Sequence, residues 1–255
     1  MKIQIVSDTH EDISRFQVNK DVDLVLHAGD FTKSDIASIE HIEAFVVKCS
    51  EEGVECAFVL GNHDYYGHDF YNSSLVKECY ERGYNLIDIY KPFVYKDYTF
   101  IGGLFGTDFK LPFDQYKDVE FTKAYCKYNI LDFYRIYSDA SKDSFITPKD
   151  YLKLYNKYLE YIKLYENKEN IVLVTHFPVS SLCLDPKYKN NPLNPYFIND
   201  IDLSGFKNVV SGHTHLTNSF KKDNVNIYIN ASGYTSQNYS QVECPEFDPN
   251  FIIEV

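Results

Sequence analysis

The chain of 255 residues has no tryptophan, a single methionine, and six cysteines that form no C-x-x-C pair. Without such pairs or the spacing of a disulfide framework, the cysteines are expected to be reduced thiols. No apolar run approaches the roughly 18 residues that a membrane span requires. A strand-forming run begins at Lys2, which leaves no room for a signal peptide. We therefore expect a soluble, cytoplasmic protein with no membrane association.

Basic residues are also scarce, because 25 lysines and arginines face 37 aspartates and glutamates, for a net charge of −12. A groove for long nucleic acid needs a basic face. The one compact basic pair, Lys221 and Lys222, falls where a hairpin turn is expected. Long nucleic acid is therefore not an expected partner.

Five short polar blocks stand out, each directly after a run of strand-forming residues. The blocks are Asp8-Thr9-His10, Gly29-Asp30, Gly61-Asn62-His63-Asp64, Thr175-His176 and Gly212-His213-Thr214-His215. The preceding runs are Ile3–Val6, Leu24–Leu26, Ala57–Leu60, Ile171–Val174 and Val209–Val210. In an open α/β sheet the carboxyl ends of the strands converge on one rim. The blocks should therefore meet in one site, which requires a single domain over residues 1–255.

The side chains of these blocks are the ligands that divalent metals use. Seven are candidates: Asp8, His10, Asp30, Asn62, His176, His213 and His215. Carboxylate, amide oxygen and imidazole suit Mn²⁺, Fe²⁺ or Zn²⁺, and seven ligands are too many for one tetrahedral zinc. If one carboxylate bridges, two ions about 3.5 to 4 Å apart can share this set and activate a water for attack on a phosphoester. A single block is also compatible with an ordinary turn, because Gly, Asn and Asp tolerate turn geometry.

The order and spelling of the blocks resemble the calcineurin-like metallophosphoesterase superfamily, whose pattern is D-x-H, G-D, G-N-H-[DE], H and G-H-x-H. The match spans Asp8 to His215. The resemblance implies an α/β fold in which two packed mixed sheets are flanked by helices, an α/β/β/α sandwich. Three further segments, 132–135, 175–178 and 230–234, resemble a bacterial and phage subgroup of that superfamily.

The resemblance also implies a role for each residue. One metal would take Asp8, His10 and His215, and the other Asn62, His176 and His213, with Asp30 bridging the two. His63 would remain unligated and protonate the leaving group, and Asp64 would orient it. The three histidines outside the blocks are expected to lie in the core (His27), toward solvent (His41) and in a loop (His68).

Between the blocks, periodicity predicts further helices and strands. Helices are expected at 34–52 with Ser34 as N-cap, at 71–82, at 116–136, and after the cap Thr147-Pro148. Strands are expected at 86–89, 93–95 and 99–102, and antiparallel strands at 209–211, 218–220, 225–230 and 251–254.

Substrate selection is expected from segment 104–147 and from the long loop 177–197, a flap over the metals. Arg135 is the candidate phosphate-binding residue, because a guanidinium binds two oxygens at once. A surface salt bridge is the alternative role for Arg135.

The leading functional hypothesis is a hydrolase of a small-molecule phosphomonoester or phosphodiester, nucleotides included, that uses two divalent metals. The alternatives are a nuclease acting on DNA or RNA ends, a protein phosphatase, and a protein-binding scaffold. The acidic charge disfavours the nuclease. The residues after Asp30 lack the arginine of the protein phosphatases, and the intact ligand set disfavours the scaffold.

Overall fold

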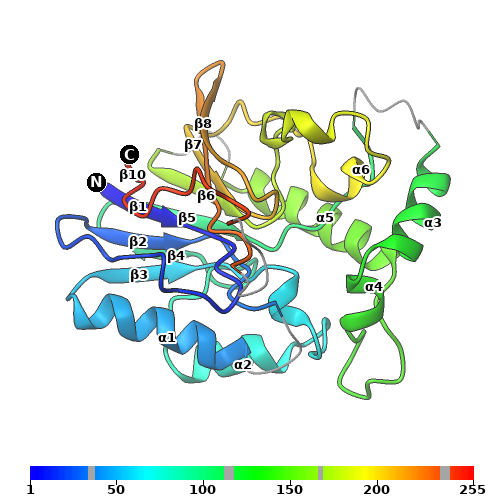
Figure 1. The fold of residues 1–255 in the computed structure, drawn as a ribbon, viewed down its shortest axis with the longest axis horizontal. Coiled ribbons are helices and arrows are strands. Elements are labelled where there is room, and N and C mark those ends of the chain that lie inside the picture. Colours follow the sequence, from blue (N-terminus) through cyan, green and yellow to red (C-terminus); the bar gives the residue numbers. More distant parts are fainter. Residues whose placement is uncertain (34–37, 112–117, 166–168, 236–241) are drawn as a thin grey trace.

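The computed structural model describes residues 1–33, 38–111, 118–165, 169–235 and 242–255, and contains two sheets (Figure 1). The first has the strand order β10-β1-β2-β3. Its strands are β1 (Lys2–Val6), β2 (Leu24–His27), β3 (Glu55–Phe58) and β10 (Ile252–Glu254). The first three are parallel, and β10 is antiparallel to β1. The chain ends lie together, with the Met1 amine donating to the Val255 carbonyl at 2.8 Å.

The second sheet has the order β4-β5-β6-β7-β9-β8. Its strands are β4 (Phe93–Tyr95), β5 (Tyr98–Gly103), β6 (Ile171–Thr175), β7 (Asn208–Ser211), β8 (Thr217–Lys222) and β9 (Val225–Asn230). The four central strands are parallel, and β4 and β8 are antiparallel edges. All five strands that precede a polar block are therefore present and parallel within their sheets.

Alternate strand residues bring the two sheets together. Ile3 and Ile5 of β1 and Val172 and Val174 of β6 are fully or almost fully buried in one apolar cluster between the sheets. Successive side chains of a strand point to opposite faces, so the remaining apolar residues face outward. Val25, for example, lies in a separate cluster on the outer face of the first sheet. The apolar residues on the outer face of each sheet must therefore be buried by other elements.

Helices provide that cover on both sides. Helices α1 (Ser38–Glu51) and α2 (Ser74–Glu81) place apolar residues such as Phe45 against the first sheet. Helix α5 (Pro148–Lys163) packs its tyrosine stripe against the second sheet. Its start has the expected N-cap Thr147, in a capping box in which Asp150 accepts from the Thr147 backbone N–H at 2.7 Å. The architecture is the α/β/β/α sandwich expected from the sequence.

The prediction of one continuous helix over residues 116–136 was wrong. The described part of this segment forms α3 (Val119–Asn129) and α4 (Asp132–Arg135), which run along the side of the molecule away from the strands (Figure 1). The helix ends at Ile130, which has an extended backbone and a buried side chain. The interruption redirects the chain so that Asp132 and Phe133 are buried.

Other expectations also need correction. Leu86 forms only an isolated bridge to Phe58, so 86–89 is not a strand within the described chain. The last four strands are not one antiparallel run, because β7 and β9 are parallel and β10 joins the other sheet. Helix α2 begins at Ser74 rather than at residue 71, because Ser73 caps it. The N-cap expected at Ser34 lies outside the described residues.

The segment 177–197 is not without secondary structure. It contains two 3₁₀ turns, η2 (Ser181–Cys183) and η3 (Pro186–Tyr188), and the short helix α6 (Asn194–Phe197). Another 3₁₀ turn, η1 (His63–Tyr65), follows β3. Among the described helices, none has the length and apolar character needed to cross a membrane.

Candidate metal centre

The backbone is unusual where the polar blocks leave their strands. Five of the expected ligands are non-glycine residues with positive φ: Asp8 (53°), His10 (45°), Asp30 (60°), His213 (71°) and His215 (47°). Positive φ is uncommon in such residues, and strained backbone concentrates at functional sites. Five of the thirteen described non-glycine residues with positive φ are therefore expected ligands at this rim.

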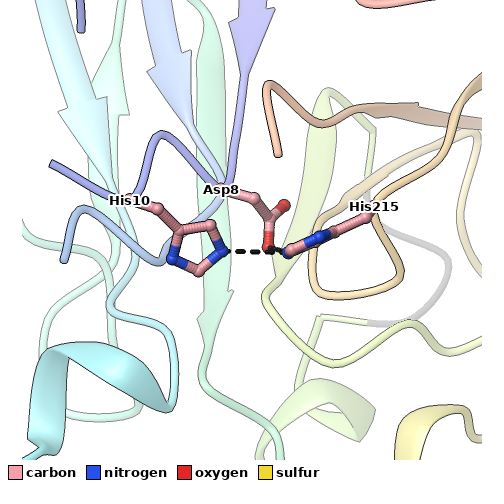
Figure 2. A group of neighbouring side chains, drawn as sticks. All are labelled: Asp8, His10 and His215. Atoms are coloured by element: carbon pink, nitrogen blue, oxygen red, sulfur yellow. Dashed lines mark hydrogen bonds and ion pairs between the residues drawn. The ribbon is translucent and has the colours of Figure 1, made fainter. Parts of the chain in front are cut away.

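One group of ligands consists of Asp8, His10 and His215, whose ligand atoms lie within 4.8 Å of one another. Figure 2 shows the Nε2 atoms of His10 and His215 pointing toward each other, 2.9 Å apart. The Nε2 of His215 is also 3.6 Å from the Asp8 Oδ1. Asp8 comes from the end of β1 and His215 from the loop after β7, so this group joins the two sheets.

A second group surrounds Asp30. Its ligand atoms, with those of His176 and His213, again lie within 4.8 Å of one another. The Asp30 Oδ1 is 3.3 Å from the His176 Nε2, and the Asn62 Oδ1 is 3.0 Å from the same nitrogen. The other Asp30 oxygen, Oδ2, lies 3.9 Å from the His10 Nε2 of the first group. Asp30 therefore lies between the two groups, with one oxygen directed at each.

Hydrogen bonds on the far side of the rings leave the inner nitrogens available. The Nδ1 of His10 is 2.9 Å from the Thr32 carbonyl, and that of His176 is 2.8 Å from the Ala28 carbonyl. The Nδ1 of His215 is 2.8 Å from Glu243. Such contacts place the proton on Nδ1 and direct the Nε2 lone pair inward, as metal-binding histidines require. In addition, the buried Nε2 of His213 has no hydrogen-bond partner in the part of the chain that the structure describes.

The electrostatics also fit bound cations. Burial raises the pKa of Asp30 from its usual value to about 6, and burial raises the pKa of Asp8 as well. Burial lowers the pKa of His10 and of His213 well below the ordinary value, which favours neutral imidazole. Buried carboxylates beside neutral imidazoles are costly without a compensating positive charge. The donor set thus fits divalent ions, and the seven expected ligands all contribute to it.

His63 lies beside this cluster, as expected, but Asp64 does not orient it. The His63 Nε2 is 3.3 Å from the Tyr234 hydroxyl, and its buried Nδ1 has no partner among the described residues. The carboxylate of Asp64 instead accepts from four backbone N–H groups, at 2.8 to 3.1 Å. The donors are Asp30, Phe31, Thr32 and Gly61. The role expected for Asp64 is therefore corrected: it ties together the loops that carry Asp30 and Asn62.

Gly61 permits this close approach of the two loops. A Cβ at position 61 would overlap the carboxylate and the backbone nitrogen of Asp30. The glycine before Asn62 is thus required by the position of Asp30, and it explains part of the G-N-H-D spelling.

Asp132 is a site residue that the sequence did not identify as such. Its buried carboxylate accepts from the Asn62 Nδ2 at 3.0 Å and from the Tyr66 hydroxyl at 2.8 Å. The hydroxyls of Tyr151 and Tyr196 donate to its other oxygen. Asp132 thereby fixes the Asn62 amide with its oxygen toward His176. The resemblance of segment 132–135 to a subgroup was the signal that could have revealed it.

Arg135, the expected phosphate-binding residue, is not placed at the site. Arg135 is the last residue of helix α4, and its side chain is exposed. A cavity lies over the cluster of candidate ligands, and Arg135 is not among the described residues that line it. Glu243 and Tyr234 line that cavity and were not expected. Tyr234 stacks on the His10 ring at 4.1 Å. No sequence signal distinguished Glu243 from the other acidic residues.

The cavity over the cluster has a volume of about 410 Å³. Four of the expected ligands line it, namely Asp30, Asn62, His213 and His215, and so do eight residues of the segment 184–197. The remaining histidines are not part of it: His27 is fully buried beside Thr9, and His41 and His68 are half-buried.

The chain is similar to known proteins in its sequence pattern and in its fold. Residues 1–216 match the family model for calcineurin-like phosphoesterases. No curated protein sequence matches the chain. Among solved structures, phosphopantetheinyl hydrolase of Mycobacterium tuberculosis is similar at a TM-score of 0.64 and 16% identity, over 91% of this chain and 89% of that one. A dimetal phosphatase of Danio rerio is similar at a TM-score of 0.48 and 12% identity, over 90% and 86%.

The fold and the cluster define a metal-dependent phosphoric ester hydrolase. The family match covers most of the chain, so the protein belongs to the calcineurin-like phosphoesterase family.

Proposed function

We propose that the protein is a two-metal phosphoesterase that hydrolyses a phosphomonoester or phosphodiester of a small molecule. The observation that carries the proposal is the position of Asp30. Its Oδ1 lies 3.3 Å from His176, and its Oδ2 lies 3.9 Å from His10. A carboxylate shared in this way serves two ions, one held with Asp8, His10 and His215 and the other with Asn62, His176 and His213.

Two divalent ions bound there would supply a nucleophile at neutral pH and neutralise charge on the phosphoryl oxygens. The donors favour Mn²⁺, Fe²⁺ or Zn²⁺, because imidazole, carboxylate and amide oxygen suit such ions. The Nδ1 contacts of His10, His176 and His215 orient these rings with Nε2 toward the ligand cluster.

The chain's own contribution to bond cleavage is centred on His63. This half-buried side chain lines the cavity beside Asp30 and Asn62 without being required as a ligand. The Tyr234 hydroxyl, 3.3 Å from its Nε2, limits how the ring is oriented. In protonated form, His63 would donate a proton to the departing oxygen, an effect that typically contributes about 10² to 10⁴-fold.

Metal analysis and a substrate screen test the proposal together. Protein purified without chelator and loaded with Mn²⁺ should bind two ions per chain by calorimetry. The loaded protein should hydrolyse at least one small ester in a panel of a monoester, a diester, cyclic nucleotides, nucleotide sugars and single-stranded DNA. A stoichiometry that stays near one would refute the two-ion site, and hydrolysis of DNA alone would favour the nuclease alternative.

A further inference from the structure

The cavity extends well beyond the metal cluster, and this outer part is mainly apolar. Its walls come from two segments far apart in the sequence, the α3–α4 junction and the segment 184–197. The apolar lining residues are Ile130, Leu131, Leu184, Leu193 and Phe197. A volume of about 410 Å³ falls within the usual range of small-molecule sites, about 300 to 1,000 Å³. It leaves room for an organic group attached to the phosphoryl group.

The charges that face this cavity are negative. Within the described chain, no lysine or arginine lines it, whereas Asp132, Asp185 and Glu243 do. Each of these carboxylates already has partners: Asp132 accepts four hydrogen bonds, Asp185 is 2.8 Å from the Lys187 ammonium, and Glu243 is 2.8 Å from His215. Lys187 is not among the described residues that line the cavity, and its ammonium is paired with Asp185. Among the described lining residues, positive charge is available only from the histidines of the ligand cluster and from the ions that they would bind.

An anionic group in the outer cavity would therefore exchange part of its hydration for neutral polar groups and carboxylates, without gaining a cationic partner among the described residues. Transfer of a charged group to such surroundings is strongly unfavourable. Apolar surface placed against Ile130, Leu184 or Phe197 would instead be stabilised by its removal from water. Asparagines 129, 191 and 194 add neutral polar groups to the lining.

We propose that the outer cavity is a leaving-group subsite, and that the substrate carries a single phosphoryl group on an uncharged, largely apolar alcohol or phenol. This inference rests on the proposed function, because the phosphoryl group must occupy the metal cluster. It predicts discrimination against nucleoside diphosphates and triphosphates, whose additional phosphates would lie in the outer cavity.

Matched esters provide the test. Phenyl phosphate and 4-carboxyphenyl phosphate, and the methyl diesters of both, differ mainly by one negative charge on the leaving group. With Mn²⁺-loaded protein, the ester with the uncharged leaving group should have a kcat/KM at least about fivefold higher than that of its carboxylated counterpart. A fivefold change corresponds to about 1 kcal/mol, the energy of one charge contact at about 4 Å in water. Binding of benzylphosphonate and 4-carboxybenzylphosphonate, measured by calorimetry, gives the same comparison without turnover.

A charge placed at the rim should change this preference. Leu131 lines the cavity and is 59% exposed, so Leu131→Lys places an ammonium there at little cost in packing. The variant should reduce the preference for the neutral ester by about fivefold. Leu164→Lys is the matched control, because Leu164 is 65% exposed, follows helix α5 and does not line the cavity. It should leave the preference unchanged.

The outcomes separate the two proposals. Equal kcat/KM and equal phosphonate affinity for the neutral and charged members, or a preference for the charged ones, would overturn the subsite. A preference in binding without hydrolysis of any ester would support the subsite and overturn the proposed function. Neither binding nor hydrolysis would overturn both.

Discussion

The carboxylate of Asp132 holds the side-chain amide of Asn62 through a hydrogen bond of 3.0 Å from Nδ2. An amide has one donor end and one acceptor end, so occupation of the donor end decides where the oxygen points. The Asn62 Oδ1 accordingly faces His176, 3.0 Å from its Nε2. A residue outside the five polar blocks thus determines how one of the expected ligands is presented.

Asp132→Asn should weaken metal binding without unfolding the protein. The new amide can donate as well as accept, so it no longer requires the Asn62 amide to point one way. Loss of such an outer contact typically costs about 10- to 100-fold in metal affinity. Titration with Mn²⁺ measures it. Asp139→Asn, a change at an exposed aspartate that is bonded to Ser141, is the control and should bind metal normally. Equal affinity in both variants would contradict the positioning role.

Asp64→Ala should destabilise the fold by about 2 to 5 kcal/mol, because it leaves buried backbone N–H groups without an acceptor. The affected donors include Asp30 and Gly61. Urea unfolding of metal-free protein gives the free energy, with Asp139→Ala as the surface control. If Asp64→Asn instead slowed the hydrolysis of an alkyl ester more than that of a nitrophenyl ester, as expected for loss of the His63 acid, Asp64 would have the orienting role after all.

Asp30→Ala should lose both ions or most of the activity, because its two oxygens face the two ligand groups. His41→Ala should change neither the metal content nor the activity, because His41 is a half-buried residue of helix α1 outside both ligand groups. Metal content by atomic absorption and turnover of a common ester compare the two. Similar losses in both variants would show that the Asp30 effect is general damage rather than loss of a shared ligand.

His63→Ala should retain metal and fold while kcat falls by about two to four orders of magnitude. If His63 protonates the leaving group, the loss should be smaller for a nitrophenyl ester than for an alkyl ester, because nitrophenolate needs little protonation. Kinetics on both esters, under conditions where the chemical step limits the rate, measure the difference. An identical loss for the two would rule out the acid role, and reduced metal content would point to a ligand role.

Stabilisation by metal should grow as the pH rises. Because burial raises the pKa of Asp30 from 3.8 to about 6, its protonation favours the folded metal-free chain at low pH. That contribution is complete below pH 3.8 and is lost as the pH rises through about 6. A bound cation replaces the proton. The increase in Tm on adding Mn²⁺ should therefore be larger at pH 8 than at pH 5.5, and the reverse order would refute the assignment.

The sequence predicted that the candidate ligands cluster, because the rule behind the prediction is geometric. Parallel strands of one sheet bring their carboxyl ends to one rim, so Asp8 and Asp30 had to converge once β1 and β2 were recognised. The packing of the second sheet on the first brings His176, which follows β6, to the same rim. This prediction needs only the positions of the strand ends, and it requires no knowledge of side-chain direction. The packing of two sheets was expected from the family resemblance and not from the strands themselves.

What the sequence could not predict depends on side-chain direction and long-range contacts. Asp132 lies 70 residues from Asn62, and its tyrosine partners come from separate segments. Arg135 is three residues from Asp132, yet it is exposed, because the break at Ile130 determines which face of α4 is buried. Composition alone did not indicate that break, since the residues around it suit a continuous helix.

The division of the ligands between the two sheets has a mechanical consequence. Asp8, Asp30 and Asn62 follow strands of the first sheet, whereas His176, His213 and His215 follow strands of the second. An ion bound by both sets is a removable link between the two sheets at one end of the sandwich, and it stabilises the folded state because it binds the assembled site and not the unfolded chain. Chelation would remove that restraint at one end only. The carboxyl ends of the strands would then separate under load before the rest of the sandwich, which is held together by the packing between the sheets.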